Sequence, residues 1–175
     1  MAALLAAVVL LTSGCSDRLG GDETTLHVFF RGGHSQAGFT HMKLGAYATF
    51  DGPYVCADGT GEGEQVVRLV DVELDPPDSG IEVTDTGVTP RRLSNVVAET
   101  AKRRLRSLPQ EVDLAHAGLI TEWCPDGDGH GQVVYVELHK DRPGTLTVDR
   151  SRYVYEVDGE LRRTPWIERG YQLTE

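Results

Sequence analysis

The chain has 175 residues and a formal net charge of −10 at pH 7. This length suits a single domain. The acidic balance argues against a nucleic-acid partner, because the phosphate backbone attracts a basic surface. We therefore expect one globular domain without nucleic acid, and no residue pattern in it indicates a cofactor.

The N-terminus begins with a short apolar run over residues 1–11. The run is too short to cross a bilayer and has the length of the apolar region of a signal peptide. It leads into Thr12-Ser13-Gly14-Cys15, which resembles a bacterial lipobox, although no Lys or Arg precedes the run. The resemblance implies that residues 1–14 are a lipoprotein signal peptide and that Cys15 carries palmitate and diacylglyceryl chains. The alternative is a buried N-terminal helix.

The expected organisation follows from this leader. Residues 15–25 are polar and contain glycine, as in a flexible tether, and residues 26–175 form a single β-rich domain. Lipidated Cys15 would hold the domain on the outer face of the cell membrane, so the lipid membrane is its first expected partner.

Most of the domain shows the alternation of apolar and polar residues that is typical of half-buried strands. In residues 67–74, for example, Val70, Val72 and Leu74 are expected to share one face. Asp158-Gly159 fits a two-residue hairpin turn. We predict a mainly β fold, an antiparallel β-sandwich. The other expected strands lie in residues 26–30, 80–88, 131–140 and 145–167.

Residues 90–108 break the alternation and predict one amphipathic helix. Its apolar positions, at helical spacing, are Leu93, Val97, Ala101, Leu105 and Leu108. Its opposite face is basic, through Arg91, Arg92, Lys102, Arg103 and Arg106. Such a face can contact anionic headgroups. Because the apolar positions are needed to cover the core, we expect instead a helix that lies across a sheet with its charges in water.

Ser35 stands in Gly33-His34-Ser35-Gln36-Ala37, close to the G-x-S-x-G turn of α/β-hydrolases. That turn follows several parallel strands, and the part of the domain before Ser35 is too short to form them. We interpret the segment as a glycine-rich turn.

The histidines give no metal site by their spacing. His27, His34 and His41 recur every seven residues. On a strand an odd spacing places neighbours on opposite faces, and no pair has the short spacing of a zinc site. His116 and His139 belong to no motif.

Cys56 and Cys124 are the remaining cysteines. In an exported protein two cysteines pair more often than they act as free thiols. We therefore predict a Cys56–Cys124 disulfide.

Residues 126–137, DGDGHGQVVYVE, match part of a calcium loop, with Asp126, Asp128, Gly131 and Glu137 on its positions. His130 stands where an oxygen ligand belongs. The exit alternates like a strand, which would carry Glu137 roughly 15 Å or more from Gly131. We predict a hairpin loop that does not need calcium, and no metal site.

Together these features resemble actinobacterial lipoproteins in which a lipobox precedes a small immunoglobulin-like or related β-sandwich with two cysteines. The resemblance rests on Thr12-Ser13-Gly14-Cys15 and on residues 53–59, 66–88 and 122–138. It implies an exported, membrane-tethered domain and confers no catalytic residue. We expect a non-catalytic binding or structural domain of the cell envelope, with a protein or cell-wall partner. The alternative is a small secreted hydrolase that uses Ser35 or a cysteine–histidine pair.

Overall fold

The fold is known from a computed structural model, which describes residues 25–30, 36–58, 66–89, 104–107, 118–124 and 131–175. Its strands form three sheets, which we name the first, second and third. The predicted mainly β, sandwich-like fold is confirmed. In the described ranges no helix is long and apolar enough to cross a membrane.

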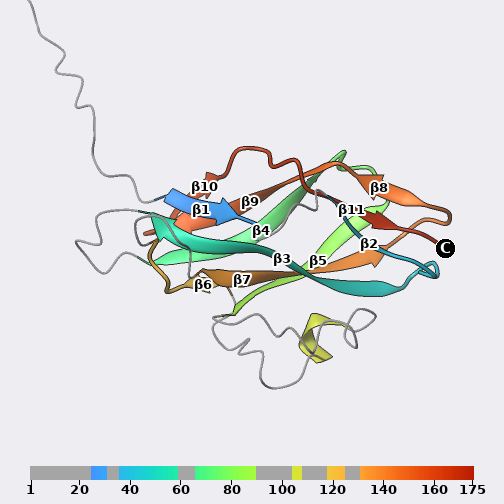
Figure 1. Ribbon diagram of the computed structural model, residues 1–175, viewed down its shortest axis with the longest axis horizontal. Helices are drawn as coiled ribbons and strands as arrows, with labels where there is room; N and C mark the ends of the chain where they lie inside the picture. Colours follow the sequence, from blue (N-terminus) through green and yellow to red (C-terminus); the bar gives the residue numbers. More distant parts are fainter. Residues whose placement is uncertain (1–24, 31–35, 59–65, 90–103, 108–117, 125–130) are drawn as a thin grey trace, which may run out of the picture.

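The first and second sheets form the two layers of the sandwich (Figure 1). The first sheet has the order β1 (Thr25–Phe29), β3 (Tyr47–Asp58), β7 (Gln132–Lys140), β5 (Ile81–Thr89). The second has the order β10 (Glu160–Arg163), β9 (Arg150–Val157), β4 (Val67–Asp75), β6 (Leu119–Ile120). Neighbouring strands within both sheets are antiparallel.

The third sheet extends the sandwich at the end where the chain terminates (Figure 1). It has the order β2 (Gln36–Phe39), β11 (Gly170–Leu173), β8 (Leu146–Val148). Its β2–β11 pair is parallel. Gly170 is required there, because a Cβ atom would lie 1.7 Å from the carbonyl oxygen of Val148.

The core lies between the layers and contains the apolar residues predicted to share one face of β7, although β7 is buried on both faces. On β7, Val134, Val136 and Leu138 are fully buried. They belong to one apolar cluster with the inward side chains of β4 and β9, such as Val72 and Tyr153. The predicted Asp158-Gly159 turn is also confirmed, since it joins β9 to β10 with φ angles of 50° and 90°.

Val70 departs from the predicted pattern. Val72 and Leu74 are buried as expected, but Val70 is 45% exposed. The cause is a register shift between Leu69 and Asp71 in the pairing of β4 with β9. A β-bulge adds one residue to one strand of a pair, so the faces on either side of it no longer follow a single alternation.

The predicted helix over residues 90–108 is not confirmed. Residues 90–103 and 108 lie outside the described ranges, and Leu105–Ser107 forms a single 3-10 turn, η1. Leu105 donates its backbone N–H to Oε2 of Glu137 at 2.5 Å. An α-helix would use that N–H within its own backbone, so the carboxylate competes with helical bonding at this residue. Leu105 itself is buried, as an apolar helix position would be.

One end of the sandwich is closed by residues 119–124, which cross from the second sheet to the first. Leu119 and Ile120 pair with β4 as β6, and Trp123 forms a parallel bridge with Ala57 of β3. The buried amide of Gln132 supports the crossing: its oxygen accepts the N–H of Thr121 at 2.6 Å. A disulfide then completes this closure.

Candidate functional site

Ion pairs cover the outer face of the second sheet. Glu73 of β4 lies opposite Arg152 of β9, and Asp75 lies opposite Arg150. Arg152 donates from Nε to Glu73 at 2.5 Å, and Arg150 donates from Nε to Asp75 at 3.0 Å. Arg163 of β10 adds a bond of 3.0 Å to the second oxygen of Glu73. The pairs arise because alternate residues of neighbouring antiparallel strands face one another.

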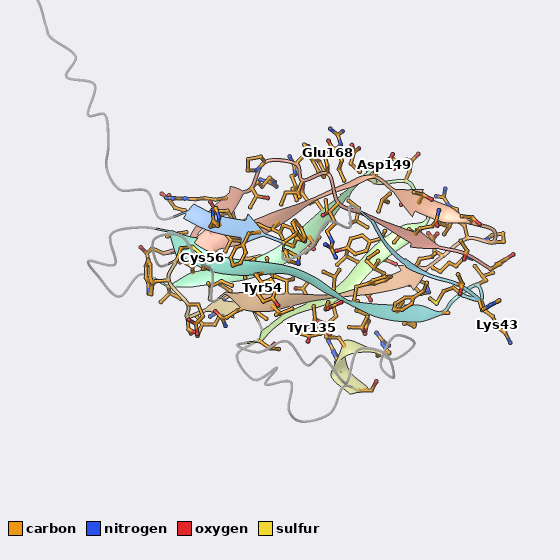
Figure 2. The ribbon with its side chains drawn as sticks, viewed as in Figure 1. Lys43, Tyr54, Cys56, Tyr135, Asp149 and Glu168 are labelled. Carbon is orange, nitrogen blue, oxygen red and sulfur yellow. A yellow bond between two sulfur atoms is a disulfide. The ribbon has the colours of Figure 1, made fainter. Side chains whose placement is uncertain are left out.

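The charges of these groups shift their pKa values. Partial burial would raise the pKa of Glu73, but hydrogen bonds from Arg163 and Arg152 outweigh it and hold this pKa below its usual value. The hydrogen bond to Asp75 raises the pKa of Arg150, and the charges of Glu168 and Asp149 add to the effect. Figure 2 shows Glu168 and Asp149 on the side of the second sheet that faces away from the first sheet. Glu73 is therefore ionised at neutral pH, and Arg150 keeps its positive charge.

Trp166 lies beside this array and is 36% exposed. The guanidinium carbon of Arg152 is 4.4 Å from the centre of a ring of Trp166, and that of Arg150 is 5.6 Å away. Such contacts are favourable because the cation meets the negative face of the ring. The carboxylates fix the arginines, and the arginines in turn fix the indole in a partly exposed position.

A cleft of about 420 Å³ opens next to Trp166. We call it the edge cleft. Its lining consists of Asp71, Val72, Glu73, Leu74, Asp75, Pro77, Ile81, Glu82, Val83, Arg152 and Trp166. Five consecutive residues of β4 and three of β5 are among them. Since successive residues of a strand point to opposite faces, a cleft that touches all of them runs along the strand edges.

The topology explains why these edges are open. β5 is the last strand of the first sheet, and β6 pairs only with Val67 and Arg68 of β4. Within the described ranges, no strand pairs with the outer edge of β4 from Asp71 to Asp75. The cleft thus lies where one edge of each layer ends.

Two carboxylates of the edge cleft differ from the others. Glu73 and Asp75 are paired with arginines, whereas Asp71 and Glu82 form no ion pair with a described Lys or Arg. Asp71 accepts the N–H of Val72 at 2.7 Å, and Glu82 lies 3.6 Å from Nδ1 of His139 with its side chain 66% exposed. The cleft therefore carries two acidic groups, one on each strand, that are open to a cation.

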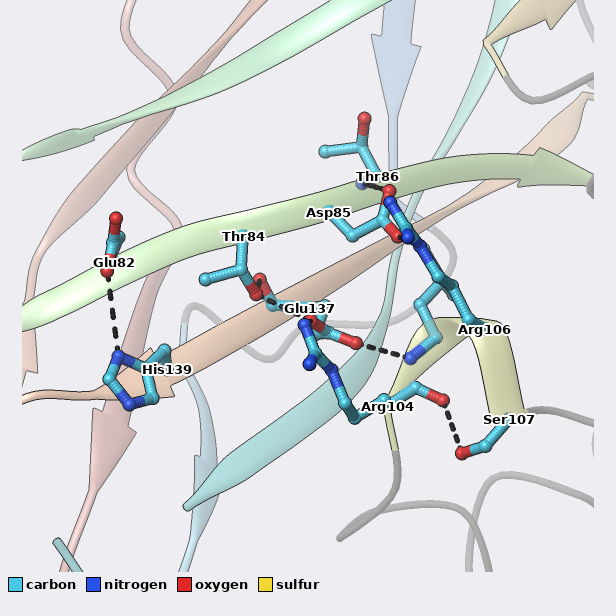
Figure 3. A network of polar contacts seen from close by, with 10 residues as sticks. Glu82, Thr84, Asp85, Thr86, Arg104, Arg106, Ser107, Glu137 and His139 are labelled. Carbon is cyan, nitrogen blue, oxygen red and sulfur yellow. Dashed lines mark hydrogen bonds and ion pairs between the residues drawn. The ribbon is translucent and has the colours of Figure 1, made fainter. Parts of the chain in front are cut away.

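Glu137 belongs to a different kind of site, on the outer face of the first sheet (Figure 3). Its side chain is completely buried. One oxygen accepts from the hydroxyl of Thr84 at 2.6 Å and from Arg104 at 3.3 Å, and the other accepts from Leu105. Tyr135 and η1 lie on this same side of the sheet (Figure 2). The carboxylate thus fastens η1 to the sheet.

Of the calcium motif, the structure describes Gly131 and Glu137. Asp126 and Asp128 lie outside the described ranges. Glu137 is engaged by Thr84, Arg104 and Leu105. Among the described residues, no group of three or more His, Cys, Asp or Glu side chains could hold a metal ion.

The predicted Cys56–Cys124 disulfide is confirmed, with the Cα atoms 5.2 Å apart. It joins Cys56 of β3 to Cys124, which directly follows Trp123 at the end of the sandwich that residues 119–124 close. Cys56 is almost fully buried there. While the bond is intact, neither sulfur can act as the thiolate nucleophile of the hydrolase alternative. Cys15, the expected lipidation site, lies outside the described ranges.

The residues considered for serine or histidine chemistry are only partly visible. His34, Ser35 and His116 lie outside the described ranges. His27 is on β1 against Phe29, with ring centres 5.8 Å apart, and His139 stacks on Tyr47 at 4.7 Å.

Sequence reasoning missed the arginine array and Trp166. A signal was present, because acidic residues at 71, 73 and 75 and arginines at 150 and 152 both recur with period two. That period places each set on one face of a strand. Pairing of the two strands could not be read from the chain.

We found no family model that matches this chain, and no curated protein that is significantly similar to it.

Proposed function

We propose that this chain is an exported lipoprotein, anchored through Cys15 on the outer face of the cell membrane, and that its sandwich is a non-catalytic binding domain. Its partner would be another protein or a component of the cell wall. The observation that carries the proposal is the Cys56–Cys124 disulfide. Disulfides persist in oxidising compartments and are rare in the cytosol, which supports export.

Anchoring is supported by the N-terminal sequence. A short apolar run leads into Thr12-Ser13-Gly14-Cys15, and a polar segment follows before the first strand. A lipid on Cys15 would hold the domain near the membrane while the tether leaves its surfaces accessible.

Binding is supported by the edge cleft. Interface hot spots are enriched in Trp and Arg that are held in place before the partner arrives. Trp166 and Arg152 have this character, since Glu73 holds the arginine and the arginine stacks on the indole.

The experiment that tests anchoring is metabolic labelling with palmitate in a lipoprotein-processing bacterium. The wild-type chain should take up label and fractionate with membranes, and Cys15→Ser should lose both properties. Label that persists in Cys15→Ser, or a wild-type chain that keeps its N-terminus and stays unlabelled, would contradict the proposal.

A fluorophosphonate probe tests the serine-hydrolase alternative on the same preparations. We expect no labelling of the folded protein. Covalent labelling at Ser35 that disappears in Ser35→Ala would show that the domain is catalytic.

A further inference from the structure

We propose that the edge cleft binds an extended peptide segment with basic residues, which adds as a strand beside β4. The inference rests on the proposed binding function and names the site and the class of partner. Strand addition takes its affinity from main-chain hydrogen bonds and its specificity from alternate side chains. Both elements are present in the cleft.

The main-chain groups follow from the register of β4 against β9. Tyr153 and Ser151 direct their backbone groups away from β4, toward Thr164 and Ile167. Their partners across the pair are Val72 and Leu74. In an antiparallel ladder such residues are non-hydrogen-bonded pairs, so Val72 and Leu74 turn their own N–H and C=O groups to the opposite side. That side is the open edge.

β5 repeats the arrangement on the other wall of the cleft. Lys140 uses its N–H and C=O toward Ala46 and Gly45, on the β3 side. Ile81, which lies opposite Lys140, and Val83, two residues further on, therefore face the open edge. The hydroxyl of Ser79 accepts the N–H of Ile81 at 3.2 Å. Within the described ranges the N–H groups of Leu74 and Val83 remain for a partner.

Asp71 controls access to the β4 edge. Its carboxylate accepts the N–H of Val72, directly after the bulge that exposes Val70. Charged side chains and bulges on edge strands protect sheets against unwanted pairing. A cation that draws the Asp71 carboxylate outward would uncover this N–H, so a basic partner is favoured over a neutral or acidic one.

The charges of the cleft select the same partner. Asp71 on β4 and Glu82 on β5 lack an arginine or lysine among the described residues, while Glu73 and Asp75 are already paired. A strand beside β4 would place alternate side chains near Asp71, where Lys or Arg is preferred. Its other side chains would meet Pro77 and Val83, where a small apolar residue such as valine fits.

The test uses the full-length, ¹⁵N-labelled chain in mild detergent, with a capped seven-residue peptide of alternating Lys and Val as the probe. We expect saturable NMR shifts at the amides of Val72 to Asp75. Two control peptides separate the causes. One has every backbone N–H methylated, which keeps the charges but removes the donors, and the other has Glu in place of Lys. Both should bind at least about tenfold more weakly.

Two variants and a matched control locate the site. Asp71→Lys and Glu82→Lys should each weaken binding of the Lys-Val peptide by about tenfold, because each reverses a charge on one wall. Asp85→Lys is the control, since Asp85 also follows a bulge and accepts the next N–H, that of Thr86, but lies outside the cleft lining. It should leave the affinity within about twofold. Glu82 is mostly exposed, so its variant is expected to fold.

Three results would overturn the inference. The first would be that the methylated or the Glu peptide binds as tightly as the Lys-Val peptide. The second would be that the NMR shifts caused by the Lys-Val peptide fall outside the edge cleft. The third would be that an oligosaccharide of N-acetylglucosamine shifts the NMR signal of the Trp166 indole while the peptide does not. The cleft would then be a saccharide site. A wild-type chain that takes up no palmitate label would instead refute the anchoring, so the two failures are distinguishable.

Discussion

The two outer faces of the sandwich use carboxylates in opposite ways. On the first sheet, Glu137 is fully buried under η1 and accepts a backbone amide, a hydroxyl and a guanidinium. On the second sheet, Glu73 stays partly exposed within an arginine array, next to a cleft. Burial makes the first arrangement a structural fastening, whereas the second keeps its arginines and Trp166 partly exposed beside the cleft. We call these the closed face and the open face.

The disulfide should have the largest effect on stability, because it fastens the closed end of the sandwich. It spans a sequence separation of 68 residues. For a loop of this length the chain-entropy model gives roughly 4 kcal/mol. We therefore expect Cys56→Ser combined with Cys124→Ser to lower the free energy of unfolding by that order, as measured by urea denaturation. An unchanged midpoint would mean that the other contacts of residues 119–124 close this end without the bond.

Glu137→Ala should have the next largest effect. It removes the acceptor of the buried N–H of Leu105 and leaves the hydroxyl of Thr84 only a 3.5 Å contact to the backbone carbonyl of the same position, at a cost of about 3 kcal/mol in the free energy of unfolding. Asp85→Asn is the matched control on the neighbouring strand, since its partner Arg106 is exposed and such pairs contribute at most about 1 kcal/mol. Equal losses in the two variants would remove the distinction between a buried and an exposed carboxylate.

Glu73 should make stability depend on pH. Its pKa in the folded state lies below its usual value despite partial burial, because Arg163 and Arg152 bond to the ionised form. Its contribution is therefore complete above the unfolded-state pKa and is lost as the pH falls through the folded-state pKa. The difference in stability between wild type and Glu73→Gln should shrink between pH 7 and pH 3. A difference that grows on acidification would contradict the assigned direction.

Trp166→Ala should have the smallest effect on stability, below about 1 kcal/mol, because the indole is exposed and only stacks on arginines. The melting temperature measured by circular dichroism should change by a few degrees at most. A loss comparable with that of Glu137→Ala would show that the open face is also a structural element.

The sequence predicted the parts of the fold that depend on local patterns. The alternation in residues 131–140 located a strand with a buried face, and two cysteines in a chain expected to be exported predicted their pairing. The helix prediction was wrong at Leu105, because the acceptor of its N–H lies 32 residues away on Glu137. Local spacing carries no information on such a contact.

The candidate site was beyond sequence reasoning for a similar reason. The edge cleft requires that β4 and β5 end up at the same side of the two layers and that β6 covers only the start of β4. Both conditions depend on how distant strands pair, which local sequence patterns do not predict. The bulge at Val70, which reverses the exposure expected for that residue, also depends on the pairing with β9.

Hydrogen exchange of single backbone amides tests the contrast between the closed and the open face most directly. We predict that the amide of Leu105 exchanges slowly because the buried carboxylate of Glu137 accepts it. The amide of Leu74 should exchange fast, although it lies within β4, because it faces the open edge. The amide of Glu73, which faces β9, should be protected. Protection of Leu74 equal to that of Glu73, together with fast exchange at Leu105, would contradict the account.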